Sequence, residues 1–160
     1  MQTPGFMKRA LLFVLACGLV MQACTTSASS QEKTLYQRLG GYDAIAAVVD
    51  DFIPRLATDP ELGKFFAGHS TGTLKKIRQL VVEQVCEATG GPCFYTGQTM
   101  KASHEGLGIT EAQWTKSVNH LVASLDKFKV PQKEKDELTA IVSTLKKDIV
   151  SSPASMAPKK

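Results

Sequence analysis

Tyr95-Thr-Gly-Gln-Thr-Met100-Lys-Ala-Ser-His104-Glu-Gly-Leu-Gly-Ile109-Thr110 is the stretch of this sequence that decides the fold. It places His104 four residues after Met100, at the end of a short polar run and just before a new helical pattern. A neutral imidazole is the commonest ligand that proteins offer to a metal ion. His104 is therefore a candidate metal ligand, and the surrounding helices would have to build a site around it.

Apolar residues recur at spacings of three and four over most of the chain, which is the pattern of amphipathic helices. The stripes run over residues 45–56, 74–85, 114–128 and 138–149, and a shorter helix is expected at 35–39. They predict an all-α domain over residues 34–150, which a four-helix bundle would also satisfy. A long loop over residues 90–109 argues against a plain bundle, because such loops inside compact domains are usually functional or disordered.

The first 23 residues form a predicted signal segment, in which Lys8 and Arg9 precede an apolar run at 10–21. That run is too short to span a bilayer comfortably. Cys24 follows, and a polar tether continues to residue 33, an arrangement that resembles the lipidation site of bacterial lipoproteins. We expect an exported protein on the periplasmic side of the envelope, lipid-anchored at Cys24, with export and release as the alternative. The polar tail at 151–160 is expected to be disordered.

Two cysteines, Cys86 and Cys93, lie outside the N-terminal segment. In an exported protein such a pair is expected to form a disulfide, which here would pin a helix end to the following loop. A metal-binding cysteine pair is the competing interpretation, but it lacks further cysteines and the usual short spacing. The formal net charge of +4 is small and evenly spread, which argues against a nucleic-acid-binding protein with a concentrated basic face.

Several motifs occur in an order and spacing that resembles the group 1 truncated haemoglobins. They are Leu35-Tyr-Gln-Arg-Leu-Gly-Gly41, Val48-Val-Asp-Asp-Phe52, Asp59-Pro-Glu-Leu-Gly-Lys-Phe-Phe66, the pair Gly90-Gly91, and the stretch from Tyr95 to Gly106. The resemblance covers nearly the whole domain. It implies a shortened globin fold, in which two antiparallel helix pairs sandwich a haem.

The same resemblance implies that His104 is the axial ligand of the haem iron, with the opposite side open for a small gas. No Cys-x-x-Cys-His sequence occurs, so a non-covalent haem b is expected. Lys75, Arg78 and Lys101 are candidates for the haem propionates, and their spacing does not decide between them. The residues that the resemblance places against the haem are Phe52, Phe65, Phe66, Ile77, Val81, Met100 and Leu107.

The predicted distal pocket departs from the family pattern. Ile53 stands where family members commonly carry tyrosine. Counting back from the second glycine pair puts Ile77 and Val81 where glutamine is frequent, if the extra residues of this chain lie in the loop at 68–73. If they lie inside the helix, Gln79 or Gln84 could face the iron instead.

An apolar distal wall would weaken dioxygen retention roughly 10- to 100-fold, because dioxygen gains about 1.5–3 kcal/mol from a hydrogen-bond donor. Carbon monoxide and nitric oxide depend less on that donor. Pro54 lies beside this wall and is expected to bend the second helix. Of the other histidines, His120 is expected to be structural. His69 is expected at the surface, with a role as a sixth iron ligand as the alternative.

These observations predict an exported haem protein that reversibly binds O2, NO and CO. An enzyme of the same fold, a nitric oxide dioxygenase or a peroxidase, is the first alternative, and it would need an external reductase as a partner. A haem-free helical lipoprotein that acts as an interaction module is the second alternative.

Overall fold

The computed structural model describes residues 32–151, and the regular structure there is entirely helical, which confirms the predicted all-α class. The elements are α1 (Leu35–Arg38), α2 (Gly41–Thr58), the 3-10 helix η1 (Gly63–Phe65), α3 (Thr71–Ala88), α4 (Met100–His104), α5 (Glu111–Lys127), α6 (Gln132–Ser143) and α7 (Lys146–Ile149). The predicted signal segment, Cys24 and residues 152–160 lie outside the described part of the chain. None of the helices in the described part is both long and apolar enough to cross a membrane.

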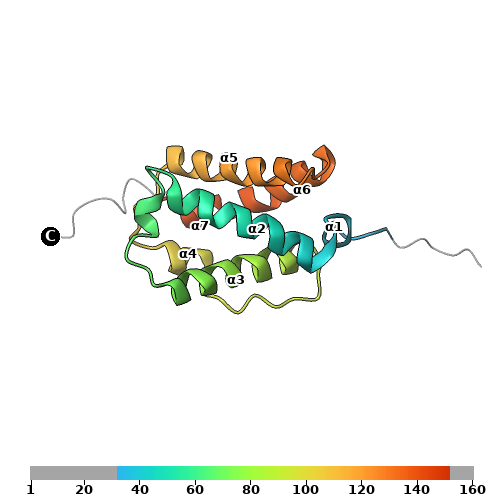
Figure 1. Ribbon diagram of the computed structural model, residues 1–160, viewed down its shortest axis with the longest axis horizontal. Helices are drawn as coiled ribbons and strands as arrows, with labels where there is room; N and C mark the ends of the chain where they lie inside the picture. Colours follow the sequence, from blue (N-terminus) through green and yellow to red (C-terminus); the bar gives the residue numbers. More distant parts are fainter. Residues whose placement is uncertain (1–31, 152–160) are drawn as a thin grey trace, which may run out of the picture. The chain divides into compact units, whose positions relative to one another are not determined.

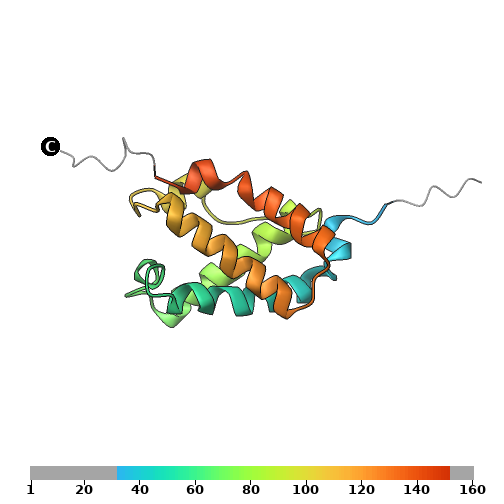
Figure 2. The same ribbon diagram turned by 90° about the horizontal axis from the view of Figure 1, so that it is seen from above.

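Helix α2 occupies the middle of the domain and packs against both α3 and α5. Figure 1 shows α2 between α5 on one side and α3 on the other, with α4 below it. In Figure 2, α5 and α6 run antiparallel beside each other, and these two helices are also in contact. The two layers are therefore a pair formed by α2 and α3 and a pair formed by α5 and α6.

Two hydrophobic clusters follow from this arrangement, one on each side of α2. The first joins α2 to α3 and is made of Ile45, Ala46, Val49, Ile53, Val82 and Cys86. The second joins α1, α2, α5 and α6 and is made of Leu35, Val48, Leu121, Leu125 and Leu138. Because neighbouring positions on α2 belong to different clusters, this helix is buried on two faces rather than on one stripe.

Charged side chains of α2 add polar contacts to both neighbours. Asp50 accepts two hydrogen bonds from Arg78 on α3, at 2.7 and 2.8 Å. Asp51 pairs with Arg55 on its own helix and with Lys127 on α5, and it accepts a hydrogen bond from Ser124 at 2.9 Å. The hydrogen bonds from Lys127 and Arg55 hold the pKa of the Asp51 carboxyl well below its usual range.

Three predicted boundaries differ from the structure. The fourth apolar stripe was expected to form one helix, but it divides into α6 and α7, because Thr144 and Leu145 bond three residues back instead of four. The loop expected at 68–73 is shorter, since α3 already begins at Thr71 after the cap at Ser70. The loop expected at 90–109 contains the short helix α4, whose first turn is capped by Thr99.

Pro54 lies inside α2, and the helix continues through it to Thr58. The Pro54 side chain faces solvent, and its carbonyl oxygen accepts a hydrogen bond from the Thr58 hydroxyl at 2.8 Å. The neighbours Ile53 and Leu56 keep their inward orientation. The proline is thus tolerated on the exposed side of the helix, where the carbonyl oxygen one turn earlier, which receives no hydrogen bond from a proline, can accept one from water.

The end of α3 is tied to the loop that follows it. The sulfur atoms of Cys86 and Cys93 lie at bonding distance, with a Cα–Cα separation of 5.8 Å, as the expected disulfide requires. Cys86 is fully buried, and any side chain at Gly91 would collide with its sulfur atom and with Tyr36. The turn after α3 is therefore packed too tightly for any residue other than glycine at this position.

The substitution Cys93→Ser tests this link. Opening a ring of this size should lower the free energy of unfolding by about 2–3 kcal/mol, mainly because the unfolded chain regains conformational freedom. Chemical denaturation of the oxidised wild-type chain and of the variant would measure the difference. Wild-type protein treated with a reductant should unfold like the variant, whereas two freely alkylated thiols in untreated protein would show that the bond does not form.

Candidate functional site

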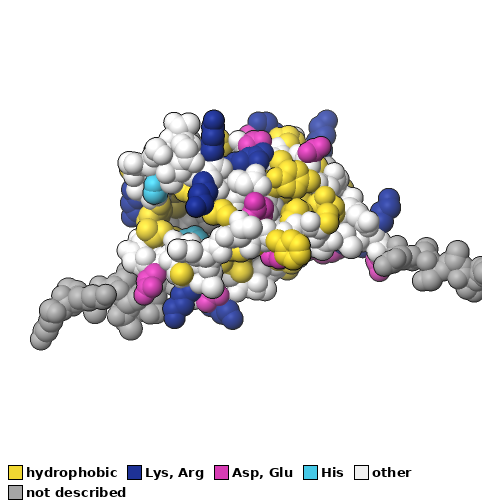
Figure 3. Space-filling model, turned by 90° about the horizontal axis from the view of Figure 1, so that it is seen from below, with side chains coloured by type: hydrophobic (Ala, Val, Ile, Leu, Met, Phe, Trp, Pro, Cys, Tyr) yellow, Lys and Arg dark blue, Asp and Glu magenta, His cyan; other side chains and the backbone are white. Residues whose placement is uncertain are grey.

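A cavity of about 650 Å³ lies between the two helix layers and is lined by residues from every helix except α1. This volume is within the range of roughly 300–1,000 Å³ that is usual for small-molecule and cofactor sites. Figure 3 shows that the cavity reaches the surface as a hollow with hydrophobic side chains around it and histidine atoms in it. The cavity can therefore admit a ligand that is mostly apolar.

All nine residues that the sequence assigned to a metal, a haem or a distal pocket line this one cavity. They are Phe52, Ile53, Phe65, Phe66, Ile77, Val81, Met100, His104 and Leu107. They come from α2, η1 and the residue after it, α3, α4 and the turn that follows α4. The structure thus brings together side chains that are up to 55 positions apart in the sequence.

Further lining residues were not assigned to the site from the sequence. Among them are Leu80, Tyr95, Trp114, Leu121 and Leu145. Several of them belong to the apolar stripes, whose periodicity does not distinguish residues that face a cavity from residues that fill a core. Tyr95 is positioned by its hydroxyl group, which donates a hydrogen bond to the carbonyl oxygen of Gln98 at 2.7 Å.

The ring of His104 is oriented by its own helix. Its Nδ1 lies 2.8 Å from the carbonyl oxygen of Met100, one turn earlier in α4. Because a carbonyl oxygen only accepts hydrogen bonds, Nδ1 carries the proton and the neutral ring keeps its lone pair on Nε2. A metal-binding histidine is typically held in this way by a second partner, which fixes its tautomer and its orientation.

The loop that leads to α4 is fastened to α3 by Glu83 as well as by the cysteine pair. The Glu83 carboxylate accepts hydrogen bonds from the N–H and the hydroxyl group of Thr96, at 3.2 and 2.8 Å, and from the Gln79 amide at 3.1 Å. These bonds, that of Gln79 first, hold the pKa of Glu83 below its usual value. The histidine-bearing helix is therefore reached through a loop with two independent attachments to α3.

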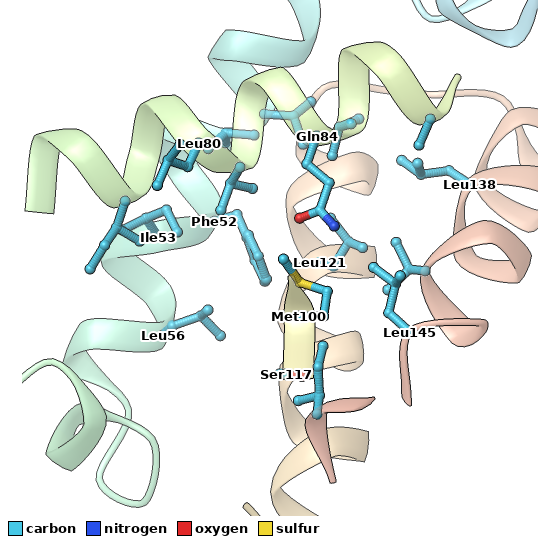
Figure 4. Close-up of a pocket in the computed structure, with 18 of the residues that line it drawn as sticks. Phe52, Ile53, Leu56, Leu80, Gln84, Met100, Ser117, Leu121, Leu138 and Leu145 are labelled. Atoms are coloured by element: carbon cyan, nitrogen blue, oxygen red, sulfur yellow. The ribbon is translucent and has the colours of Figure 1, made fainter. Parts of the chain in front are cut away.

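Most polar groups on the cavity wall are already hydrogen-bonded within the protein. The hydroxyl groups of Ser103, Ser117 and Thr144 donate to backbone carbonyls, and the Gln113 side chain accepts from the N–H of Thr110. Gln84 differs, because its side chain makes no hydrogen bond within residues 32–151. In Figure 4 the Gln84 amide points from α3 into the space above Met100.

The structure separates the two glutamines that the sequence left open. Gln84 lines the cavity together with Ile77, Leu80 and Val81, which share one face of α3. Gln79 is on a different face, where its amide bonds the hydroxyl group of Tyr42 at 3.0 Å and the Glu83 carboxylate. Of the two glutamines, Gln84 alone is therefore placed to meet a ligand in the cavity. Its amide lies on the same face of α3 as Ile77 and Val81, which the sequence assigned to an apolar distal wall.

The remaining histidines occupy different places. His69 lies in the turn before α3, with an exposed side chain that lines the mouth of the cavity. His120 lies on α5 outside the cavity lining, and its Nε2 is 2.9 Å from the carboxylate of Asp59. Its structural role was the interpretation favoured by the sequence.

Among the candidates for haem propionates, Arg78 is committed elsewhere, because its guanidinium group binds Asp50 of α2. Lys75 and Lys101 are exposed and form no ion pair within the described residues. They remain the two candidates of the original three.

These features fit a haem. The cavity offers a broad apolar space, an imidazole whose Nδ1 is bonded to the backbone, which leaves Nε2 to bind a metal, and the amide of Gln84, which makes no hydrogen bond within the described residues. Within the described residues, no group of three or more His, Cys, Asp and Glu side chains could hold a metal ion. One histidine fixed by its backbone bond would suit a metal whose remaining protein-independent ligands come from a macrocycle.

Comparisons with known proteins agree with this geometry. Residues 34–151 match the family model described as "Bacterial-like globin". A group 1 truncated haemoglobin from Mycolicibacterium paratuberculosis is 33% identical over 125 residues, which cover 78% of this chain and 90% of the relative. One from Nostoc commune is 35% identical over 88 residues, which cover 55% of this chain and 72% of the relative.

Solved structures show the same fold. The truncated haemoglobin of Tetrahymena pyriformis in its Fe(III) form superposes with a TM-score of 0.70 at 22% identity, covering 75% of this chain and all of the other. The 2/2 haemoglobin of Synechococcus sp. PCC 7002, described in a cyanomet state with covalently attached haem, gives a TM-score of 0.67 at 27% identity, covering 74% and 98%. The predicted shortened globin fold is thus confirmed, and the chain belongs to the bacterial-like globin family, with group 1 truncated haemoglobins among its relatives.

Proposed function

We propose that this globin is an exported haem protein that binds diatomic gases, with His104 as the axial ligand of a non-covalently held haem. The observation that carries the proposal is the hydrogen bond from His104 Nδ1 to Met100, because it leaves Nε2 as the only ring nitrogen able to bind a metal. Haem supplies an iron with one further coordination position for a small gas. The protein supplies the imidazole, the apolar walls and the exclusion of water.

The walls have separate tasks in this proposal. Phe52, Phe65 and Phe66 offer large apolar surfaces to the macrocycle, and Met100 and Leu107 flank His104 on its own side. Ile53, Ile77 and Val81 form the wall around the gas. Neither cysteine of the described domain is available for a covalent link to haem while the two are bonded to each other. This supports a haem held only by His104 and by packing.

Gln84 adds a hydrogen-bond donor to a pocket that the sequence predicted to be apolar. The Gln84 side chain is half-buried and makes no hydrogen bond within residues 32–151, so its amide is free to donate to a ligand in the cavity. Dioxygen gains more from such a donor than carbon monoxide does. We therefore expect the pocket to retain dioxygen longer than a fully apolar pocket would. Retention should be weaker than in a site where several donors converge on the ligand.

The location of the protein is part of the proposal and rests on the sequence of residues 1–33. The basic start, the apolar run and Cys24 support export followed by lipid anchoring at the periplasmic side of the envelope. The placement of Cys86 and Cys93 at bonding distance is compatible with an oxidising compartment. A reductase is a further expected partner, because an iron that cycles between oxidation states needs an electron donor.

The first test compares His104→Ala with His69→Ala, a histidine on the same cavity but on another segment. Wild-type protein reconstituted with haem should show an intense Soret band that shifts on addition of carbon monoxide. The band should collapse or change type in His104→Ala and persist in His69→Ala, because only His104 is held with a free nitrogen towards the cavity. Haem extracted intact by acidified solvent would confirm non-covalent binding.

If His104→Ala kept the wild-type spectrum while His69→Ala lost it, the axial ligand would be assigned wrongly. Thermal unfolding of both variants without haem is the control for folding. Neither substitution should lower the midpoint by more than a few degrees, since both side chains are at least partly exposed in the haem-free protein.

A second test compares Gln84→Leu with Gln79→Leu, which lies on the same helix but outside the cavity. Gln84→Leu should accelerate dioxygen dissociation roughly 10- to 100-fold, the effect of losing a donor to a ligand that carries partial negative charge, with a smaller effect on carbon monoxide. The C–O stretching frequency should also change in this variant only. Equal effects of the two substitutions would indicate a general disturbance of α3 instead of a donor in the pocket.

A third test addresses the anchor through Cys24→Ser. Expressed from its full reading frame in a bacterial host, the wild-type chain should incorporate radiolabelled palmitate and sediment with membranes. Cys24→Ser should lose the label and either remain unprocessed or appear in a soluble fraction, because no thiol is left to carry the lipid. An unlabelled wild-type chain in the soluble periplasmic fraction would favour export with release.

A further inference from the structure

The segment that joins α2 to α3 carries part of the cavity wall but has little structure of its own. It contains Phe65 and Phe66, which line the cavity, and Leu62, which is buried. Its one regular element, η1, has three residues. A single 3-10 turn does not hold its own position, so the wall has to be fixed by contacts with other parts of the fold.

Asp59 supplies such a contact at the start of the segment. One carboxylate oxygen accepts hydrogen bonds from the N–H groups of Glu61 and Leu62, at 2.8 and 3.1 Å. The other oxygen lies 2.9 Å from Nε2 of His120 on α5. The Asp59 side chain is only 9% exposed and that of His120 is 26% exposed, so water competes weakly for this hydrogen bond. One side chain therefore shapes the turn and ties it to α5.

The pair belongs to a polar stripe along one side of α5. One turn before His120, Lys116 pairs with Glu61 of the segment. One and two turns after it, Ser124 and Lys127 bind Asp51 of α2. The charged groups that face the pair are therefore Lys116 and Glu61, which bond each other, with Asp51, Arg55 and Lys127 farther along. Histidine is the only side-chain type in this stripe that ordinarily changes charge between about pH 5 and 8.

We propose that Asp59 and His120 are positioning residues that hold the Phe65–Phe66 wall of the cavity, and that protonation of His120 tightens this hold. The neutral ring already donates to an ionised carboxylate, and protonation adds the Coulomb attraction of a second charge to that hydrogen bond. The wall is therefore held more firmly in mildly acidic solution than at pH 8. The expected effect on haem retention rests on the function proposed above. The expected effect on how firmly the wall is held does not depend on that function.

The charge of Asp59 does not vary over this range. The hydrogen bond from His120, followed by that from the Glu61 N–H, lowers the pKa of Asp59 to about 2. A carboxyl group with a depressed pKa contributes stability above its ordinary pKa of 3.8 and loses that contribution as the pH falls towards 2. Between pH 5 and 8 the Asp59 carboxylate therefore keeps its charge.

Hydrogen exchange at the amides of Phe65 and Phe66 tests the inference, measured on the full chain before and after haem loading at pH 5.5 and 8.0. After correction for intrinsic exchange, wild-type protection should be roughly 3-fold higher at pH 5.5, as expected from the added strength of a charged hydrogen bond. His120→Gln keeps a donor at the same reach without a charge change, so it should retain part of the protection and lose the pH dependence.

Two further variants separate positioning from general stability. Asp59→Asn keeps an oxygen for the turn and removes the charge, so it should also flatten the pH profile. Glu61→Gln breaks the neighbouring ion pair and should lower protection equally at both pH values, leaving the pH ratio unchanged. A pH ratio that persisted in His120→Gln would overturn the proposal, as would one that disappeared in Glu61→Gln.

Haem loss to excess apomyoglobin provides the second measurement. At each pH the rate of haem loss from the wild-type chain is divided by the rate from His120→Gln. This ratio should be lower at pH 5.5 than at pH 8.0, by about the same factor as the change in exchange protection. If the chain takes up no haem but the exchange profile depends on His120, the proposed haem function fails while the positioning pair stands. If haem binds normally and the exchange profile is flat in the wild type, only the positioning pair fails.

Discussion

The burial of α2 on two faces is the constraint on which the other features depend. Val49 and its cluster partners fix α3 on one side, and Val48 and its partners fix α5 and α6 on the other. Even the charges of α2 are directed at these neighbours, since Asp50 binds α3 and Asp51 binds α5. With both layers attached to one helix, the space between them is lined by members of both clusters, such as Val49 and Leu121, and by Phe52, which packs against both. The walls of the cavity are thus continuous with the two cores that meet on α2.

A cavity built in this way needs its other wall to be supplied by weaker elements. Helix α4 has five residues and η1 has three, and helices of that length are not stable by themselves in water. Each is held from outside: α4 by contact with α7 and by a loop bonded to α3 through Glu83 and the cysteine pair, η1 by Asp59 and α5. The histidine and the phenylalanines at the cavity therefore stand on short elements whose positions are set by specific polar or covalent links. Small changes in those links can alter the site while the two clusters stay intact.

The sequence contained enough information for the class of fold and for most of the site. Helical periodicity predicted the long helices, and counting back from Gly90-Gly91 brought Ile77 and Val81 to the cavity. Periodicity failed at Thr144 and Leu145, where a local change to tighter hydrogen bonding divides a continuous apolar stripe without any proline or glycine to mark it. It also could not choose between Gln79 and Gln84, because the answer depends on how α3 is rotated against α2. The contact between Asp59 and His120 spans 61 positions, and neither residue belongs to an apolar stripe, so no local pattern could have indicated it.

The distribution of polar groups explains why an apolar pocket can still discriminate between ligands. A hydroxyl group that already donates to the backbone has little left to offer a ligand, and this applies to Ser103 and Ser117. In the proposed haem site, selectivity would depend on groups that the protein leaves free, among them the Gln84 amide, the NH2 group of Gln113, whose oxygen alone is bonded, and Nε2 of His104. Within the described residues no fully buried side-chain nitrogen or oxygen lacks a hydrogen-bond partner, so the free amide of Gln84 is within reach of water in the empty cavity. Such a donor can exchange its water for a bound ligand, which is how a mostly apolar wall can distinguish a ligand that accepts a hydrogen bond from one that does not.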